Sequence, residues 1–166
     1  MELNTIFFIG PQGSGKGTQA RVLADRLRFK YWEMGRILRE VAKEAADLGR
    51  EVKNMIDNGI LLPDELLYKV VESRLSQIDK NQGLIFDGIP RRIGQAEFLM
   101  NFLQKQGRKS FTTLFIDLPK AESLKRLLGR AQHEGRADDT REVIEKRLEQ
   151  YYEATLPVVE YLKERT

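Results

Sequence analysis

The sequence contains no cysteine and a single histidine, His133, among its 166 residues. Without cysteine the chain can form no disulfide and offers zinc no thiolate, and one histidine excludes a site built from several imidazoles. No apolar run approaches the roughly 20 residues that cross a bilayer, and the first residues lack the basic-then-apolar order of a signal peptide. We therefore expect a cytoplasmic protein that binds no zinc and no membrane.

The charge balance limits the kind of partner that the chain can have. Hydrophobic residues make up 41% and charged residues 32% of the chain, and the net charge is +3. This composition is ordinary for a folded domain large enough to bury a core. No long block of lysine and arginine marks a nucleic-acid-binding tail. A small phosphorylated ligand therefore fits better than a polymer.

Short apolar runs bounded by glycine or proline alternate with segments of helical spacing. The runs predict strands at 5–9, 29–32, 84–87 and 114–118. The predicted helices are 16–27, 35–46, 51–57, one starting at Pro63, 93–106, 121–130 and 141–165, with a loop at 132–139 and a kink at Pro157. Phe7, Phe8 and Trp32 are expected in the core and His133 in an exposed loop. The alternation predicts an α/β fold, a parallel sheet with helices on both faces, whose ligands bind beyond the carboxyl ends of the strands.

The segment Gly10-Pro-Gln-Gly-Ser-Gly-Lys-Gly-Thr18 follows the first predicted strand and opens the first predicted helix. This is the context of a Walker A loop, in which glycines let successive backbone N–H groups point at phosphates. The helix N-terminus adds partial positive charge, and Lys16 adds a point charge. The strict pattern has Ser or Thr directly after the lysine, whereas here Gly17 precedes Thr18. The loop predicts binding of nucleotide phosphates.

The run Gly-Lys-Gly-Thr-Gln at 15–19 resembles the adenylate kinases, and further segments agree with that family in order and spacing. They are Gly-Ile-Leu-Leu-Pro-Asp-Glu at 59–65, Asp-Gly-Ile-Pro-Arg-Arg-Ile-Gly-Gln at 87–95, Arg-Leu-Leu-Gly-Arg at 126–130, Gly-Arg-Ala-Asp-Asp at 135–139 and Arg147. The resemblance covers essentially the whole chain. It implies a three-layer P-loop NTPase fold with two small inserts.

The resemblance also implies a domain layout and a short lid. Residues 1–166 would form a single kinase domain with a core of 1–32, 63–129 and 140–166, a monophosphate-binding segment at 33–62 and a lid at 130–139. The lid has no room for a zinc-bearing hairpin. The protein is expected to be a monomer with ATP and AMP as substrates and Mg²⁺ as the cofactor.

The resemblance assigns a role to each matching residue. ATP would be bound by Gly13, Ser14, Gly15, Lys16, Gly17 and Thr18, with Arg126 stacked on its base. The residues implied to bind AMP are Met34, Gly35, Arg39, Leu61, Leu62, Gly88, Arg91, Gln95, Arg136 and Arg147, with Gln95 at the base. The implied catalytic residues are Lys16, Asp87, Arg91, Arg130, Arg136 and Arg147, and Asp87 would hold Mg²⁺ through water.

The chemistry of phosphoryl transfer is consistent with a site rich in arginine. Negative charge spreads over the equatorial oxygens of the transferred group, so the protein supplies positioning and electrostatic stabilisation. A phosphate acceptor needs no general base from the protein. Each arginine taken alone would more often be a solvated surface charge. Asp138 and Asp139 either cap the following helix or belong to the lid.

The sequence departs from the family pattern in two places besides the short lid. Met34 stands where the family usually has Thr or Ser, and Arg36 where it usually has Asp, which bears on the identity of the acceptor base. The family also has a further strand and helix beyond the long kinked helix. Without them the strand at 114–118 would be an exposed edge. The given sequence is then either a truncated form, which we favour, or a reduced form that covers this edge in another way.

Three other functions are weighed against an ATP–AMP kinase. A UMP/CMP kinase would use the same machinery, although Gln95 favours AMP. A switch GTPase requires an Asn-Lys-x-Asp motif, which this sequence lacks. A non-catalytic nucleotide-binding module is disfavoured because Lys16, Asp87 and the arginines are all retained.

Overall fold

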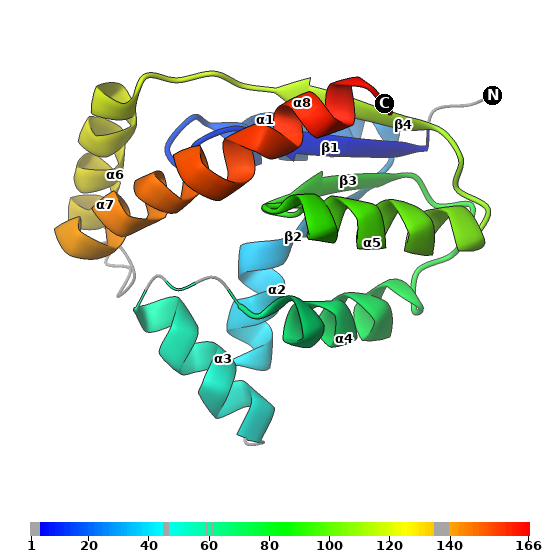
Figure 1. Cartoon of the computed structure of the whole chain (residues 1–166), viewed down its shortest axis with the longest axis horizontal. Coiled ribbons are helices and arrows are strands. Elements are labelled where there is room, and N and C mark those ends of the chain that lie inside the picture. Colours follow the sequence, from blue (N-terminus) through cyan, green and yellow to red (C-terminus); the bar gives the residue numbers. More distant parts are fainter. Residues whose placement is uncertain (1–3, 45–46, 59, 61, 135–139) are drawn as a thin grey trace.

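A four-stranded parallel sheet forms the centre of the molecule (Figure 1). The computed structural model describes residues 4–44, 47–58, 60, 62–134 and 140–166. The strands are β1 (Thr5–Ile9), β2 (Lys30–Glu33), β3 (Leu84–Asp87) and β4 (Phe111–Phe115), in the order β2-β3-β1-β4. Each strand pairs in parallel with its neighbours, so all carboxyl ends lie at one edge of the sheet.

Helices cover both faces of this sheet, which confirms the predicted fold class. The side chains of β1 alternate: Phe7 and Ile9 belong to one hydrophobic cluster, and Ile6 and Phe8 to another. The second cluster packs against α1 (Lys16–Leu27) through Ala20 and Ala24. The first cluster packs against helices α4 (Asp64–Leu75), α5 (Ile93–Lys105) and α8 (Leu156–Lys163).

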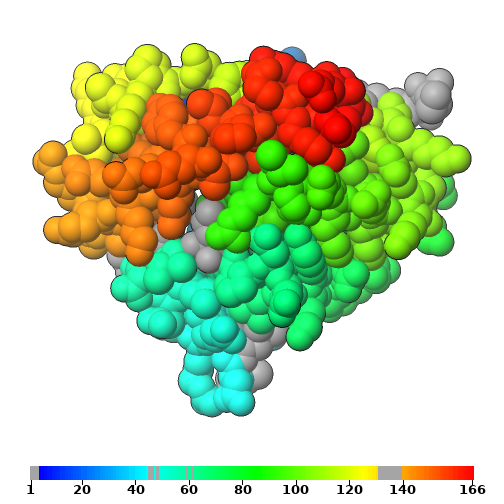
Figure 2. Space-filling view, viewed as in Figure 1, coloured from blue at the N-terminus to red at the C-terminus, as the bar shows by residue number. Residues whose placement is uncertain are grey.

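The remaining helices flank the carboxyl edge of the sheet. They are α2 (Met34–Val41), α3 (Asp47–Asp57), α6 (Lys120–Glu134) and α7 (Arg141–Gln150). In the space-filling view the cyan surface of α3 projects at the bottom of the molecule, below α7 in orange (Figure 2). No helix within the described ranges has the length and apolar character required to span a membrane.

The long C-terminal helix is interrupted where a kink was predicted. A π-helical turn, Tyr151–Thr155, separates α7 from α8, and Pro157 lies in the first turn of α8. Proline lacks the N–H that a continuous helix would use, so a change of helical pitch just before it accommodates the missing bond.

Several predicted boundaries were wrong. The last strand runs over Phe111–Phe115 rather than 114–118, because it pairs with β1 only as far as Ile9. The helix predicted at 35–46 ends at Val41, and the helix predicted at 51–57 begins earlier, at Asp47, so that it includes Gly49. A Cβ on Gly49 would clash with the backbone oxygen of Glu44, so this glycine permits a close approach. Helix α6 continues to Glu134, through part of the predicted loop.

The outer position of β4 agrees with the predicted exposed edge. Leu114 and Phe115 are 37% and 39% exposed, whereas Phe86 in the inner strand β3 is completely buried and contacts the rings of Phe7 and Trp32. The apolar interior is therefore concentrated under β1 and β3, the two strands that lead into the predicted site.

We predict a large difference between two phenylalanine truncations. Phe86→Ala should lower the free energy of unfolding by about 3–5 kcal/mol, because it opens a cavity between the rings of Phe7 and Trp32. Phe115→Ala should cost less, on the order of 1 kcal/mol, because Phe115 is 39% exposed at the edge of the sheet. Denaturant titration of both variants checks this, and equal losses would contradict the assigned core.

Candidate active site

The loop between β1 and α1 has the backbone of a phosphate cradle. Gly13 and Gly15 adopt φ angles of 80° and 85°, a left-handed conformation that glycine enters without strain. Helix α1 begins at Lys16, directly after Gly15, so its first N–H groups face the loop. The Lys16 ammonium folds back over the loop and donates to the carbonyl oxygen of Pro11 at 3.0 Å. Thr18 is exposed in the first turn of α1.

Lys16 lies among other charged groups at the carboxyl edge of the sheet. Burial lowers the pKa of Lys16 to about 8; Asp87 opposes this shift, while Arg91 and Arg130 lower the pKa further. Asp87 ends β3, the neighbour of β1 in the sheet. The fold therefore holds three cations near one carboxylate, which is favourable once an anion arrives.

Asp87 is oriented by a tyrosine that the sequence analysis missed. The Tyr31 hydroxyl donates to Asp87 Oδ2 at 2.8 Å, and burial together with Asp87 raises the pKa of that phenol. A Cβ on Gly17 would lie 3.3 Å from both Asp87 Oδ2 and Tyr31 Oη. Gly17 thus lets the first turn of α1 pack closely against this pair, a physical reason for glycine after the lysine. The position of Tyr31 near the carboxyl end of a predicted strand was the available signal.

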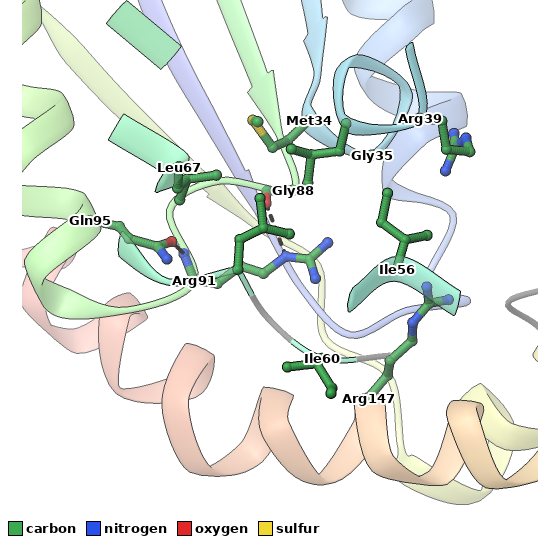
Figure 3. Close-up of a pocket in the computed structure, with 12 residues that line it drawn as sticks. Met34, Gly35, Arg39, Ile56, Ile60, Leu67, Gly88, Arg91, Gln95 and Arg147 are labelled. Atoms are coloured by element: carbon green, nitrogen blue, oxygen red, sulfur yellow. Dashed lines mark hydrogen bonds between the residues drawn. The ribbon is translucent and has the colours of Figure 1, made fainter. Parts of the chain in front are cut away.

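A second pocket opens beside the phosphate loop (Figure 3). In Figure 3, Arg39, Arg91 and Arg147 lie toward one end of this pocket and Gln95 toward the other. The walls between them are mostly apolar. The lining residues are Met34, Gly35, Leu38, Arg39, Ile56, Ile60, Leu62, Leu67, Gly88, Arg91, Gln95 and Arg147. A cationic end and an opposite end with an amide suit a ligand with a phosphate and a polar ring.

Arg91 is held at the junction of the two pockets. Its Nε donates to the carbonyl oxygen of Gly88 at 2.9 Å, and its own carbonyl oxygen accepts from the Thr155 hydroxyl at 3.1 Å. Burial and the nearby Arg147 lower the pKa of Arg91, whereas Asp87 opposes the shift. The π-helical turn therefore fixes the backbone of an arginine that faces other positive charges.

Two acidic residues that the sequence analysis did not single out hold pocket residues in place. Glu33 pairs with Arg39 at 3.3 Å and with Arg21 at 3.6 Å. Asp64 Oδ1 accepts from Gln95 Nε2 at 2.8 Å. Neither contact is visible as a sequence pattern, because each joins residues from different elements.

The departures at positions 34 and 36 differ in consequence. Met34 is 2% exposed and lines the second pocket, so it replaces a hydroxyl there with an apolar thioether. Arg36 lies on the exposed side of α2, where it pairs with Glu40 at 3.4 Å, and it is not a lining residue.

The other predicted site residues fall into three groups. Arg130 and Arg147 are half-buried, and each lowers the pKa of a neighbouring cation. Arg126 is half-exposed and pairs with Glu122 at 2.8 Å, although its Cβ lies near Gly13. Thr140 caps α7, its hydroxyl oxygen accepting from Val143 N. Leu61, Arg136, Asp138, Asp139, the side chain of His133 and lid residues 135–139 lie outside the described residues.

These features define a class of protein. A parallel sheet with a phosphate loop at its carboxyl edge, next to a pocket with arginines at one end, is the arrangement of a nucleoside monophosphate kinase. A family model described as adenylate kinase matches residues 8–166. The chain therefore belongs to the adenylate kinase family.

Individual relatives agree with this assignment. The chain is 42% identical over 163 residues to adenylate kinase 1 of Nostoc sp. strain PCC 7120, covering 98% of this chain and 86% of the relative. It is 40% identical over 161 residues to the adenylate kinase of Phocaeicola vulgatus, covering 97% and 85%. It is 39% identical over 160 residues to that of Thermus thermophilus, covering 96% and 83%.

We predict that nucleotide affinity falls in alkaline solution because of Lys16. Because its pKa is about 8, the Lys16 amine is almost fully protonated only well below pH 8. The dissociation constant for ATP, used as the probe, should be steady from pH 6.5 to about 7.5 and rise above pH 8, approaching tenfold per unit. Calorimetric titration across this range measures the profile.

The Lys16→Arg variant is the control, because a guanidinium does not titrate in this range. Its affinity is expected to be weaker but independent of pH up to about pH 9.5. A flat profile for the wild type, or parallel curves for the two proteins, would contradict the role given to the Lys16 ammonium.

Proposed function

We propose that this chain catalyses the reversible transfer of the γ-phosphoryl group of ATP to AMP, giving two ADP. One observation carries the proposal: the pocket at the phosphate loop and the second pocket adjoin, and Gly88 and Arg91 line both. Two phosphorylated ligands seated in them would meet at Arg91. This is the arrangement that direct transfer between two nucleotides requires.

The donor half of the site consists of the loop and the start of α1. The backbone from Gly13 to Thr18 would surround the ATP phosphates, and Lys16 would contact their outer oxygens. Arg126, near Gly13, would stack on the adenine after leaving Glu122. Asp87 favours the charged form of Lys16, because it opposes the lowering of the Lys16 pKa by burial and by the arginines.

The acceptor half is the second pocket. Arg39 and Arg91 would bind the phosphate of AMP, with Arg39 exchanging Glu33 for the ligand. Met34, Leu62 and Gly88 would contact the nucleoside, and Gln95 would bind the adenine edge. Gly35 gives Arg39 room, since a Cβ there would lie 3.2 Å from Arg39 Nη1. Leu61 and Arg136, outside the described residues, would complete this half.

The transferred group would be surrounded by cations. Arg91 lies between the two halves, Arg147 faces it from α7, and Arg130 at α6 acts on Lys16. These groups would stabilise charge that develops on the equatorial oxygens, and a single arginine of this kind can contribute about 10³–10⁵ in rate. Arg136 is proposed to join them from the lid.

Mg²⁺ is the proposed cofactor, and the donor set fits it. Within the described ranges no three acidic or histidine side chains gather as a dedicated metal cage. Mg²⁺ usually keeps several waters and is bound through one or two carboxylates together with substrate phosphates. Asp87, oriented by Tyr31, would hold the ion through water. When bound, the ion would neutralise charge on the ATP phosphates.

The segment 33–62 and the lid 130–139 are proposed to close over the substrates, because water in the site would compete as the acceptor. The end of α3 already contacts α7, where Lys146 Nζ donates to the carbonyl oxygen of Asn58 at 3.4 Å. We further propose a cytoplasmic monomer, with one domain over 1–166 and no nucleic acid or membrane as a partner.

One observation favours an alternative acceptor. Met34 places no hydroxyl in the pocket, where a hydroxyl would help to fix the nucleoside. UMP or CMP is therefore the second candidate, with the same transfer mechanism.

The test is a coupled assay with ATP and Mg²⁺ against AMP, CMP, UMP and GMP. We expect AMP to have the highest kcat/KM. In the same assay Arg91→Met should lower kcat/KM for AMP about 10³-fold or more. Arg141→Met is the control, because Arg141 is exposed and pairs, among the described residues, with Glu145, and its activity should be unchanged. Equal use of all four acceptors, or an active Arg91→Met variant, would overturn the proposal.

A further inference from the structure

A polar cluster fixes the side chain of Gln95 from two sides. Gln95 is 3% exposed and lies in the first turn of α5. Its Oε1 accepts from the Arg91 backbone N–H at 2.9 Å, and its Nε2 donates to Asp64 Oδ1 at 2.8 Å. Arg92 Nη1 donates to the same Asp64 oxygen at 2.9 Å. The cluster therefore joins the start of α4 to the start of α5.

These contacts allow only one orientation of the Gln95 amide. A backbone N–H can only donate, and an ionised carboxylate can only accept. Reversing the amide would place Nε2 against the Arg91 N–H and Oε1 against the Asp64 carboxylate, so both hydrogen bonds would be lost. The relative order of the amide oxygen and the amide nitrogen in the pocket wall is thus determined by Arg91 and Asp64.

The fixed order matters because the amide keeps bonding capacity for a ligand. A primary amide has two N–H groups and two oxygen lone pairs, and the protein uses one of each. One donor and one acceptor therefore remain, in a fixed order. Adenine presents an amino donor at position 6 beside an acceptor nitrogen at position 1. Hypoxanthine and guanine present the reverse, a 6-oxo acceptor beside an N–H.

We propose that Asp64, held by Arg92, is a positioning residue that makes the acceptor site discriminate 6-amino from 6-oxo purine monophosphates. This inference rests on the proposed function, in which Gln95 contacts the acceptor base. Asp64 acts through Gln95 and does not touch the substrate.

Arg92 strengthens the arrangement in two ways. Its ion pair with Asp64, at 2.9 Å, holds in place the carboxylate oxygen that accepts from Gln95. The same Nη1 also donates to the Leu62 carbonyl oxygen at 3.2 Å. Leu62 lines the pocket, so Arg92 ties the wall of the pocket to the residue that orients Gln95.

A simpler role for Asp64 must be separated from this one. Asp64 is the first residue of α4, where an acid stabilises the helix whatever else it contacts. Glu65 is another acid in that turn, is exposed, and has no contact with Gln95 among the described hydrogen bonds. Glu65→Ala is therefore a matched control for the loss of a helix N-terminal acid.

The experiment compares AMP and IMP as acceptors, because these ligands differ only in the 6-substituent and the proton on N1. The wild type should strongly prefer AMP. Asp64→Ala should lower the AMP:IMP ratio of kcat/KM about tenfold or more, mainly through a higher KM for AMP. Asp64→Asn keeps an acceptor oxygen and should restore the ratio to within about threefold of the wild type. Gln95→Leu removes the amide altogether, so its AMP:IMP ratio of kcat/KM is the lower limit against which the Asp64 variants are compared.

Thermal unfolding of each variant separates positioning from stability. Glu65→Ala should lower Tm less than Asp64→Ala, because it removes no contact with Arg92 or Gln95, and it should leave the AMP:IMP ratio unchanged. If Asp64→Ala does not fold, Arg92→Met provides the test, with an expected fall of about two- to fivefold in the ratio. An unchanged ratio in the folded Asp64→Ala variant, with a wild type that prefers AMP, overturns this inference alone. A wild type that does not phosphorylate AMP overturns the proposed function as well.

Discussion

Burial of neighbouring cations is the constraint on which the rest of this structure depends. Burial lowers the pKa of Lys16, and Arg91 and Arg130 lower it further; burial and Arg147 lower the pKa of Arg91, and Asp87 opposes both shifts. Such an arrangement costs free energy in the ligand-free protein and becomes favourable when phosphate enters. The parallel sheet makes it possible, because β1 and β3 end side by side and deliver the loop and Asp87 to one edge.

The surrounding structure holds these cations in place. The π-helical turn provides Thr155 to bind the backbone of Arg91, and Gly88 accepts from its side chain. Tyr31 orients Asp87, and Gly17 leaves space for that contact. The apolar core lies beneath, where Phe7, Phe86 and Trp32 form a continuous set of ring contacts. The π-helical turn and the glycines near the site thus hold the charged side chains in position.

The sequence predicted best where local signals decide structure. The bounds of β1, α1 and β3 were predicted correctly, because apolar runs end there at glycines and helical spacing begins at Lys16. The phosphate loop was predicted from its place between a strand and a helix, and the arginines were predicted from the resemblance to the adenylate kinases. The position of β4 was missed because its pairing ends where its partner β1 ends, which is a property of two distant segments.

Residues that act through others were not predictable in this way. Tyr31 meets Asp87 across 56 residues of chain, and Gln95 meets Asp64 across 31. Glu33 pairs with Arg39 only because a strand ends where α2 begins. Gly49 permits the close approach of the Glu44 backbone, which no local sequence pattern predicts. These contacts depend on tertiary packing, and one sequence contains no record of which side chains meet.

The central claim is that the charged Lys16 destabilises the ligand-free fold and stabilises the complex with a phosphorylated ligand. The most direct measurement is the unfolding free energy of Lys16→Met and of the wild type, with and without ATP. Burial lowers the pKa of Lys16 to about 8 in the folded chain. The charged ammonium therefore destabilises the fold fully below pH 8, and this destabilisation disappears as the pH rises toward the pKa of Lys16 in the unfolded chain. Without ligand at pH 7, Lys16→Met should be more stable, on the order of 1–3 kcal/mol, and the gap should narrow above pH 8. Saturating ATP should make the wild type the more stable protein. A ligand-free Lys16→Met variant that is less stable than the wild type at pH 7 would contradict the account.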